Sequence, residues 1–129
     1  EPNDGYWSNV WNNDAKGWCA CYWGGRPAET MMFSAAYVAE SKWNDTSWKT
    51  TDSAVKFNQL VKDARKELDE NKKRDILFEC QRLIYDDGGL LCPLFNSYVS
   101  ANSKKIAHGK IAANWDSDGA KCVERWWFA

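Results

Sequence analysis

Hydrophobic residues recur with a helical spacing most clearly between residues 53 and 68. Apolar side chains lie three and four residues apart there, namely Phe57, Leu60, Val61, Ala64 and Leu68. Lys, Asp, Arg and Glu fill the positions between them, as on the solvent-facing side of an amphipathic helix. The pattern predicts a helix over about residues 53–68.

A second helical stripe follows within a few residues. Its apolar members are Ile76, Leu77, Cys80, Leu83 and Ile84. Asp69 is suited to cap the start of this helix. The run Asp-Asp-Gly-Gly at 86–89 is suited to end it, because glycine readily adopts the left-handed conformation found after a helix. The short connection between the two patterns predicts an antiparallel helix pair.

The amino-terminal third combines a strand-like run with shorter helical patterns. Residues 16–23 predict a buried strand that leads into a Gly-Gly turn, and Pro27 suits the first turn of a helix over about residues 28–40. Nearer the amino terminus, Trp7 and Trp11 lie four residues apart and predict a short helix or turn.

The carboxyl-terminal third contains short apolar runs. Residues 90–95 and 98–101 predict strand segments, which Pro93 interrupts because it cannot donate a hydrogen bond to a sheet. A turn at 114–119 precedes the ending Glu-Arg-Trp-Trp-Phe-Ala, which predicts an exposed apolar patch unless another surface covers it. The order of helices and strands predicts an α/β fold, with α+β as the alternative.

Length and charge exclude some functions. The 129 residues are about enough for one domain, and 17 basic and 18 acidic residues leave a net charge of -1. No block of like charge is long enough to form an arm that binds nucleic acid or a membrane surface. We therefore do not expect either kind of binding. No apolar run approaches the roughly 20 residues of a membrane-spanning helix. The chain starts at Glu1 without a signal-like segment, so we expect that a leader was removed or that the chain is part of a longer protein.

Nine tryptophans are more than a core of this size requires. A buried indole N–H needs a hydrogen-bond partner, so some of these rings are expected to face a ligand or another protein surface. The others are expected in the core.

The five cysteines do not predict a metal or redox site. One residue separates Cys19 from Cys21, rather than the two of a zinc knuckle, and Cys80, Cys92 and Cys122 stand alone. A role as small core residues is the simpler prediction. The odd number leaves at least one thiol unpaired unless it bridges to another chain.

The sequence also lacks a recognisable catalytic arrangement. Its single histidine, His108, has no partner motif. Asp86 and Asp87 lie at a helix end, and Asp116 and Asp118 lie in a turn, where aspartates commonly have structural roles. We therefore expect a protein that is not an enzyme and that has no cofactor and no metal.

The run from Tyr22 to Arg26 predicts the wall of a ligand pocket. Aromatic faces at Tyr22 and Trp23, the backbone amides of Gly24 and Gly25 and the Arg26 guanidinium suit an uncharged or anionic organic ligand. The alternative for Arg26 is a surface charge at the start of a helix.

Residues 57–101 resemble a known family. The residues that carry the resemblance are Ala64, Arg65, Leu68, Asp69, Arg74, Gln81, Asp86, Asp87, Gly88 and Pro93. In this spacing they are similar to the carboxyl-terminal segment of the family 5 extracellular solute-binding proteins, the dipeptide-, oligopeptide- and nickel-binding receptors of ABC importers. Residues 21–48 and 113–129 resemble one branch of that family.

The resemblance implies a non-catalytic receptor that closes on a peptide-like or other small organic solute and presents it to an ABC permease. It also implies a periplasmic or extracellular location, in which a disulfide can persist. Residues 1–104 would form part of the carboxyl-terminal lobe of a type II periplasmic-binding-protein-like fold, with the helix pair packed on a small sheet. Residues 105–129 would be the tail that returns to an amino-terminal lobe absent from this chain. The uncovered apolar ending predicts self-association, for example as a homodimer.

Cys21 departs from the peptide-binding members of the family. By alignment, the aspartate that pairs with the ligand's ammonium group in those members falls at Cys21, and a thiol carries no compensating charge. The resemblance therefore favours a ligand carboxylate at Arg26, with Tyr22 and Trp23 stacking on the rest of the ligand. Together with Gly24, these residues make up the predicted ligand site.

Two other functions stay open at the level of sequence. One is a self-standing, aromatic-rich module that binds carbohydrate or another small ligand on Trp7, Trp11, Trp23, Trp43 or Trp48. The other is a small enzyme that depends on Cys21.

Overall fold

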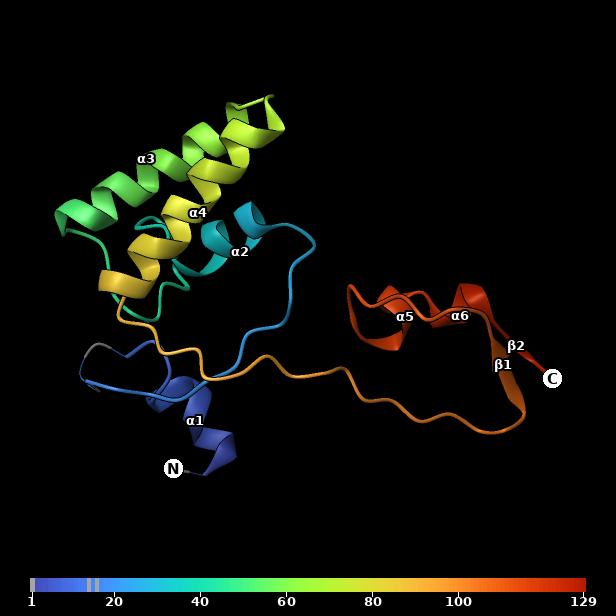
Figure 1. Ribbon diagram of the computed structural model, residues 1–129. Coiled ribbons are helices and arrows are strands. Elements are labelled where there is room, and N and C mark those ends of the chain that lie inside the picture. Colours follow the sequence, from blue (N-terminus) through green and yellow to red (C-terminus); the bar gives the residue numbers. More distant parts are fainter. Residues whose placement is uncertain (1, 14, 16) are drawn as a thin grey trace. The chain divides into compact units, whose positions relative to one another are not determined.

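The computed structural model describes residues 2–13, 15 and 17–129 (Figure 1). The described residues form two compact units. The helical unit comprises those of Glu1–Gly24 and Ala28–Leu91, and the carboxyl-terminal unit comprises Gly25–Pro27 and Cys92–Ala129. Most of the regular secondary structure in the described residues is helical, and an antiparallel sheet of two strands accompanies the helices. At this coarse level the fold agrees with the predicted α/β or α+β class.

The predicted helix pair is confirmed. Helix α3 spans Asp52–Lys66 and α4 spans Glu70–Asp87. The Asp69 carboxylate accepts hydrogen bonds from two backbone N–H groups of the first turn of α4, as expected of a cap. The two helices lie side by side in Figure 1 and are joined by a short turn. Ser53 at the start of α3 donates to Asp87 at the end of α4, so the pair is antiparallel.

The end of α4 follows the predicted glycine signal. Gly88 is the last residue to close a helical hydrogen bond, and Gly89 has a φ of 69°, in the left-handed region that glycine adopts without strain. The Asp87 carboxylate beside it accepts from the hydroxyls of Thr51 and Ser53 and, at 2.8 Å, from the Trp48 indole. Hydrogen bonds from Ser53, Trp48 and Thr51 lower the pKa of Asp87.

The apolar core of the helical unit forms around Phe57. Its buried hydrophobic members are Phe33, Ala36, Tyr37, Trp48, Ala54, Phe57, Val61, Cys80, Leu83 and Ile84. The Phe57 ring is fully buried and lies 5.6 Å from the Phe33 ring and 5.2 Å from the Trp48 ring, measured between centroids. The sequence stripes of both long helices therefore face one shared core, as their periodicity predicted.

The helix predicted over residues 28–40 is shorter in the structure. Helix α2 spans Glu29–Ala36 and packs on α3. Buried Asn44 donates its side-chain amide to the carbonyl oxygens of Tyr37 and Trp48, at 3.3 and 3.0 Å. These bonds hold the chain after α2 in a closed loop, which competes with continuation of the helix.

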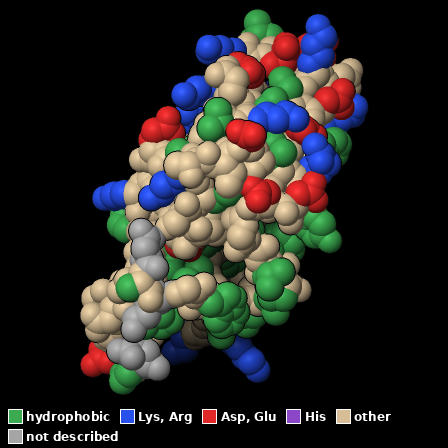
Figure 2. All heavy atoms as spheres, turned by 90° about the vertical axis from the view of Figure 1, so that its left-hand side faces the viewer, with side chains coloured by type: hydrophobic (Ala, Val, Ile, Leu, Met, Phe, Trp, Pro, Cys, Tyr) green, Lys and Arg blue, Asp and Glu red, His purple; other side chains and the backbone are tan. Residues whose placement is uncertain are grey.

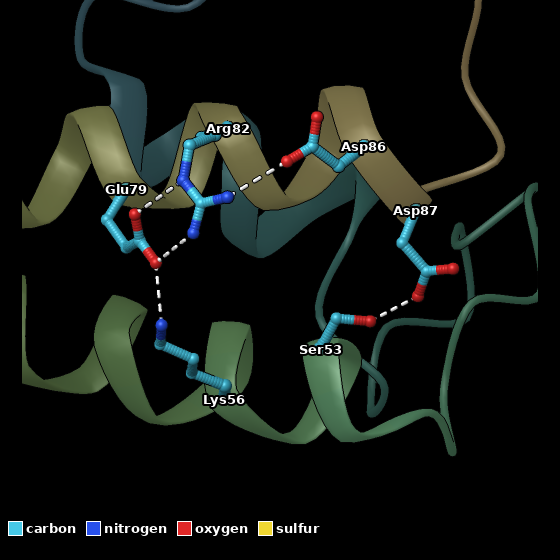
Figure 3. A network of polar contacts seen from close by, with 6 residues as sticks. All are labelled: Ser53, Lys56, Glu79, Arg82, Asp86 and Asp87. Atoms are coloured by element: carbon cyan, nitrogen blue, oxygen red, sulfur yellow. Dashed lines mark hydrogen bonds and ion pairs between the residues drawn. The ribbon is translucent and has the colours of Figure 1, made fainter.

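Ion pairs cover the solvent side of the helix pair. Glu79 on α4 pairs with Lys56 on α3 at 2.6 Å and with Arg82 at 2.7 Å, and Arg82 also pairs with Asp86 at 3.0 Å (Figure 3). Hydrogen bonds from Arg82 and Lys56 lower the pKa of Glu79 to about 2. Figure 2 shows Lys, Arg, Asp and Glu side chains interspersed over the upper part of this face, at the level of the helix pair. Since these groups are exposed to water, we expect them to contribute little to stability.

The prediction of a buried strand at 16–23 is wrong: the described residues of this range form no strand. Residues 17–24 have neither helical nor strand structure, and the side chains of Trp18 and Tyr22 are each 76% exposed. Single side-chain contacts hold this segment instead of a strand ladder, among them a hydrogen bond from the Tyr6 hydroxyl to the Ala20 carbonyl. Lys16 lies outside the described residues.

The short helix predicted near the amino terminus is confirmed. Helix α1 spans Asn3–Asn9 and contains Trp7. Trp11 follows its end, and the two rings meet edge to face with centroids 5.7 Å apart. The spacing of four residues therefore brings the rings into contact, as expected.

The carboxyl-terminal unit contains a pair of strands, but other residues form them than those predicted. Residues 90–95 and 98–101 have no strand structure, and all of them except the half-buried Leu90 are exposed. Strand β1 (Ile106–His108) instead pairs antiparallel with β2 (Trp126–Phe128), with Ile106 opposite Phe128. The predicted apolar ending thus forms a strand, in which Trp127 and Phe128 stay exposed.

The turn predicted at 114–119 organises the carboxyl-terminal unit. It forms the short segment α5 (Asp116–Ala120), in which Asp118 has a φ of 60°, and α6 (Cys122–Arg125) follows. Asp118 is only 3% exposed, and its carboxylate accepts from the Ala112 backbone N–H at 2.6 Å and the Trp126 indole at 3.0 Å. It also pairs with Arg125 at 2.9 Å. A structural role for this aspartate, as predicted, agrees with these contacts.

The helix pair and the sheet belong to different units. In the helical unit the pair packs on α2, and both strands lie in the carboxyl-terminal unit. The division into a lobe over residues 1–104 and a tail over residues 105–129 describes the architecture of a larger protein. This division stays a prediction.

Candidate functional site

The carboxylate of one residue, Asp45, gathers side chains from two other segments of the helical unit. Asp45 lies in the loop between α2 and α3 and is half-buried. One of its oxygens, Oδ2, accepts from the Trp11 indole at 2.8 Å, the Trp23 indole at 3.2 Å and the Cys21 thiol at 3.3 Å. Trp11 follows α1, and Cys21 and Trp23 belong to the extended segment before α2. Residues distant in sequence therefore converge on Asp45.

Aromatic rings surround this carboxylate, with Trp11 at their centre. The Trp11 ring stacks on Trp43, with centroids 5.5 Å apart and planes 28° apart, and it meets Trp7 and Trp23 edge to face at 5.7 and 6.3 Å. Tyr22 meets Trp7 edge to face at 5.5 Å. We refer to these residues together as the Asp45 cluster: Trp7, Trp11, Cys21, Tyr22, Trp23, Trp43 and Asp45. Edge-to-face and offset stacking are the favoured arrangements of aromatic rings.

Side-chain hydrogen bonds of neighbouring residues fix the Asp45 cluster to the rest of the unit. Asn12 adopts a φ of 54° and donates its side-chain amide to the Lys42 carbonyl at 2.7 Å. Thr46 donates to the side chain of Asn44, the buried residue that closes the loop after α2. The loop that carries Asp45 is therefore held both by the amino-terminal segment and by the core.

The Cys21 thiol acts as a hydrogen-bond donor in this cluster. Burial and the hydrogen bond to Asp45, together with the charge of Asp45, raise the pKa of Cys21 to about 12. At neutral pH the group is therefore a neutral thiol and a poor nucleophile.

The predicted ligand residues fall into two groups. Cys21, Tyr22 and Trp23 all join the Asp45 cluster, and Gly24 follows them at the boundary of the helical unit. Arg26 belongs to the carboxyl-terminal unit, where its guanidinium lies 5.6 Å from the centroid of the Trp115 ring. The structure thus brings the first three residues together.

Sequence reasoning missed Asp45, the residue on which the cluster converges. A signal was present, because each buried indole N–H needs an acceptor and Asp45 stands in a polar loop close to two tryptophans. The same indole-to-carboxylate contact recurs at Trp48 with Asp87 and at Trp126 with Asp118. Many of the surplus tryptophans therefore have a structural partner.

One tryptophan named for sugar binding is unsuitable. Trp48 is 5% exposed and belongs to the core around Phe57, so its ring cannot stack on a ligand without unfolding. Trp7 and Trp43 are 42% and 43% exposed, and they keep part of their surface in water.

In the part of the chain that the structure describes, no group of three or more His, Cys, Asp or Glu side chains is placed to bind a metal ion. None of the described helices combines the length and the apolar character that crossing a bilayer requires.

Comparison of the chain with protein-family models, with curated proteins and with solved structures found no match.

Proposed function

We propose that this chain is the carboxyl-terminal part of a family 5 extracellular solute-binding protein. It captures a peptide-like or other small organic solute without catalysing a reaction, for import by an ABC permease from the periplasm or the extracellular space. The observation that carries the proposal is the Asp45 carboxylate framed by the Trp11 and Trp23 indoles. A few polar groups among aromatic walls are typical of small-molecule sites.

Asp45 supports a peptide-like ligand because it provides the negative charge that Cys21 lacks. The resemblance places a ligand-pairing aspartate at position 21, where this chain has a thiol, and the Asp45 carboxylate lies 3.3 Å from that thiol. The negative charge therefore reaches the same place from the loop before α3. An ammonium group of a peptide-like ligand has a counter-charge there, which a thiol alone would not supply.

The protonated state of Cys21 supports capture rather than chemistry. A thiol with a pKa of about 12 contributes a neutral donor, and the aromatic rings contribute apolar contact area. In the complete receptor, closure would follow from a higher affinity of the ligand for the closed state than for the open one. The exposed ending of the chain, with Trp127 and Phe128, supports the proposal of self-association.

The test is a titration of the chain with the dipeptide Ala-Ala, followed by the indole N–H signals in nitrogen-15 NMR spectra. We expect the Trp11 and Trp23 signals to shift with saturation. Asp45→Asn should weaken binding at least about tenfold, because it removes a charge-assisted contact. Asp75→Asn makes the same change at an exposed position on α4 and should have no effect.

Two outcomes would contradict this proposal. If Ala-Ala leaves the indole signals of the Asp45 cluster unmoved, the cluster is not a site for peptide-like solutes. If maltose shifts the signals of Trp7 and Trp43 and Ala-Ala does not, the exposed rings belong to a carbohydrate-binding module instead.

A further inference from the structure

The chain places one of its own cations on the Asp45 cluster. The Lys42 ammonium nitrogen lies 4.3 Å from the centroid of the Trp43 ring, well within the range of a cation–π contact. Trp43 stacks on Trp11, which in turn donates to Asp45. An ammonium group therefore already occupies an aromatic surface that is connected to a carboxylate.

The donors to Asp45 leave its charge in place. Trp11, Trp23 and Cys21 are all neutral groups, so their hydrogen bonds orient the carboxylate without cancelling its negative charge. An anionic group and electron-rich ring faces attract the same kind of ligand group, which is an organic cation.

We propose that the Asp45 cluster selects solutes that carry an alkylated, quaternary ammonium group, and that Lys42 is a resident competitor for the face of Trp43. This inference rests on the proposed function, because it specifies the ligand of the same site. The ligand cation displaces the Lys42 ammonium from the ring, and the Asp45 carboxylate supplies the long-range attraction.

Displacing Lys42 requires no change of the backbone. Its side chain is exposed, and the contact that fixes this residue is made by its carbonyl oxygen, which accepts from Asn12 at 2.7 Å. The ammonium can therefore swing into water while the loop stays closed, at the modest cost of one exposed cation–π contact.

The experiment compares choline with 3,3-dimethyl-1-butanol, its neutral isostere, on the full chain. Both are titrated while the Trp43 and Trp11 indole N–H signals are followed by NMR. We expect choline to bind at least about tenfold more tightly, because the two probes differ only in charge. Lys42→Ala should tighten choline binding about threefold by removing the competitor, and Trp43→Leu should weaken it.

Lys49→Ala is the matched control, since it removes the same charge from an exposed position outside the cluster. It should leave the affinity for choline unchanged. If Lys42→Ala and Lys49→Ala raise the affinity equally, Lys42 is not a competitor and that part of the inference falls.

The remaining outcomes separate this inference from the proposed function. Equal binding of choline and its neutral isostere would overturn the cation preference, while the cluster would remain a site for small organic solutes. If neither probe moves the indole signals but Ala-Ala does, the proposed function stands and the inference falls. If none of the three compounds moves them, both fall.

Discussion

The two units of this chain are stabilised in different ways. The helical unit buries a set of apolar side chains around Phe57, supplied by α2, α3, α4 and the loop after α2. In the carboxyl-terminal unit the buried residue among those described is an aspartate, Asp118, which gathers a backbone N–H, an indole and a guanidinium. One unit distributes its stability over many contacts, and the other concentrates it on one charge.

This difference has a consequence for stability. Burial of apolar surface adds up over many residues and does not depend on pH. A buried carboxylate stabilises only while it is ionised and keeps all of its donors. The carboxyl-terminal unit should therefore be the more sensitive of the two to a single substitution or to acid.

The largest expected effect comes from Phe57→Ala, which removes the centre of the apolar core. We expect the free energy of unfolding of the helical unit to fall by about 3–5 kcal/mol, from lost burial and from the cavity that remains. Urea unfolding followed by far-ultraviolet circular dichroism measures it. Phe78→Ala removes a ring that is 58% exposed and should change the value by less than about 0.5 kcal/mol. Equal effects of the two substitutions would contradict the role of the core.

Acid should unfold the carboxyl-terminal unit before the helical unit. The backbone N–H of Ala112, the Trp126 indole and the Arg125 charge lower the pKa of Asp118. A lowered folded pKa means that this stabilisation is complete above the unfolded value of about 4 and is lost as the pH falls through the folded value. The Trp126 indole signal and the contact of Ile106 with Phe128 should disappear in that window while α3 and α4 persist.

Asp118→Asn is the control for this acid transition. Asparagine has nearly the same shape but cannot titrate, so the carboxyl-terminal unit of this variant should be less stable at neutral pH and should lose its dependence on acid. A helical unit that unfolds first, or a variant that keeps the acid transition, would refute the assignment of the transition to Asp118.

The smallest expected effect is that of Lys56→Ala, which breaks the contact between Lys56 and Glu79 across the helix pair (Figure 3). Both side chains reach water, and Glu79 keeps Arg82 as a partner. We expect the melting temperature to change by no more than about 2 °C. A larger shift, as measured by thermal unfolding at moderate salt, would mean that surface charge contributes to the helical unit on the scale of its core.

The sequence predictions succeeded where the structure depends on interactions between residues close together in the chain. The helix pair, the Asp69 cap and the stop at Gly89 follow from residues within a few positions of one another. The strand at 16–23 failed because a strand needs a partner elsewhere in the chain, which local alternation cannot identify. The strands at 90–95 and 98–101 failed for the same reason.

The candidate site shows the same division. The sequence pointed to Cys21, Tyr22 and Trp23 as residues of one wall, and the structure brings them together. It did not point to Asp45, because the chain closes a long loop before that carboxylate meets Trp11, 34 residues away.

By itself, the sequence determined the helix pair, its caps and the apolar faces that meet at Phe57, because periodic burial and capping act over one or two helical turns. Only the tertiary structure decided which carboxylate each indole reaches: Asp45 for Trp11 and Trp23, Asp87 for Trp48 and Asp118 for Trp126. The physical reason is that a buried N–H must find an acceptor, but no local rule states which one. That choice is made when the chain folds, and it places a negative charge among the aromatic rings of the proposed site.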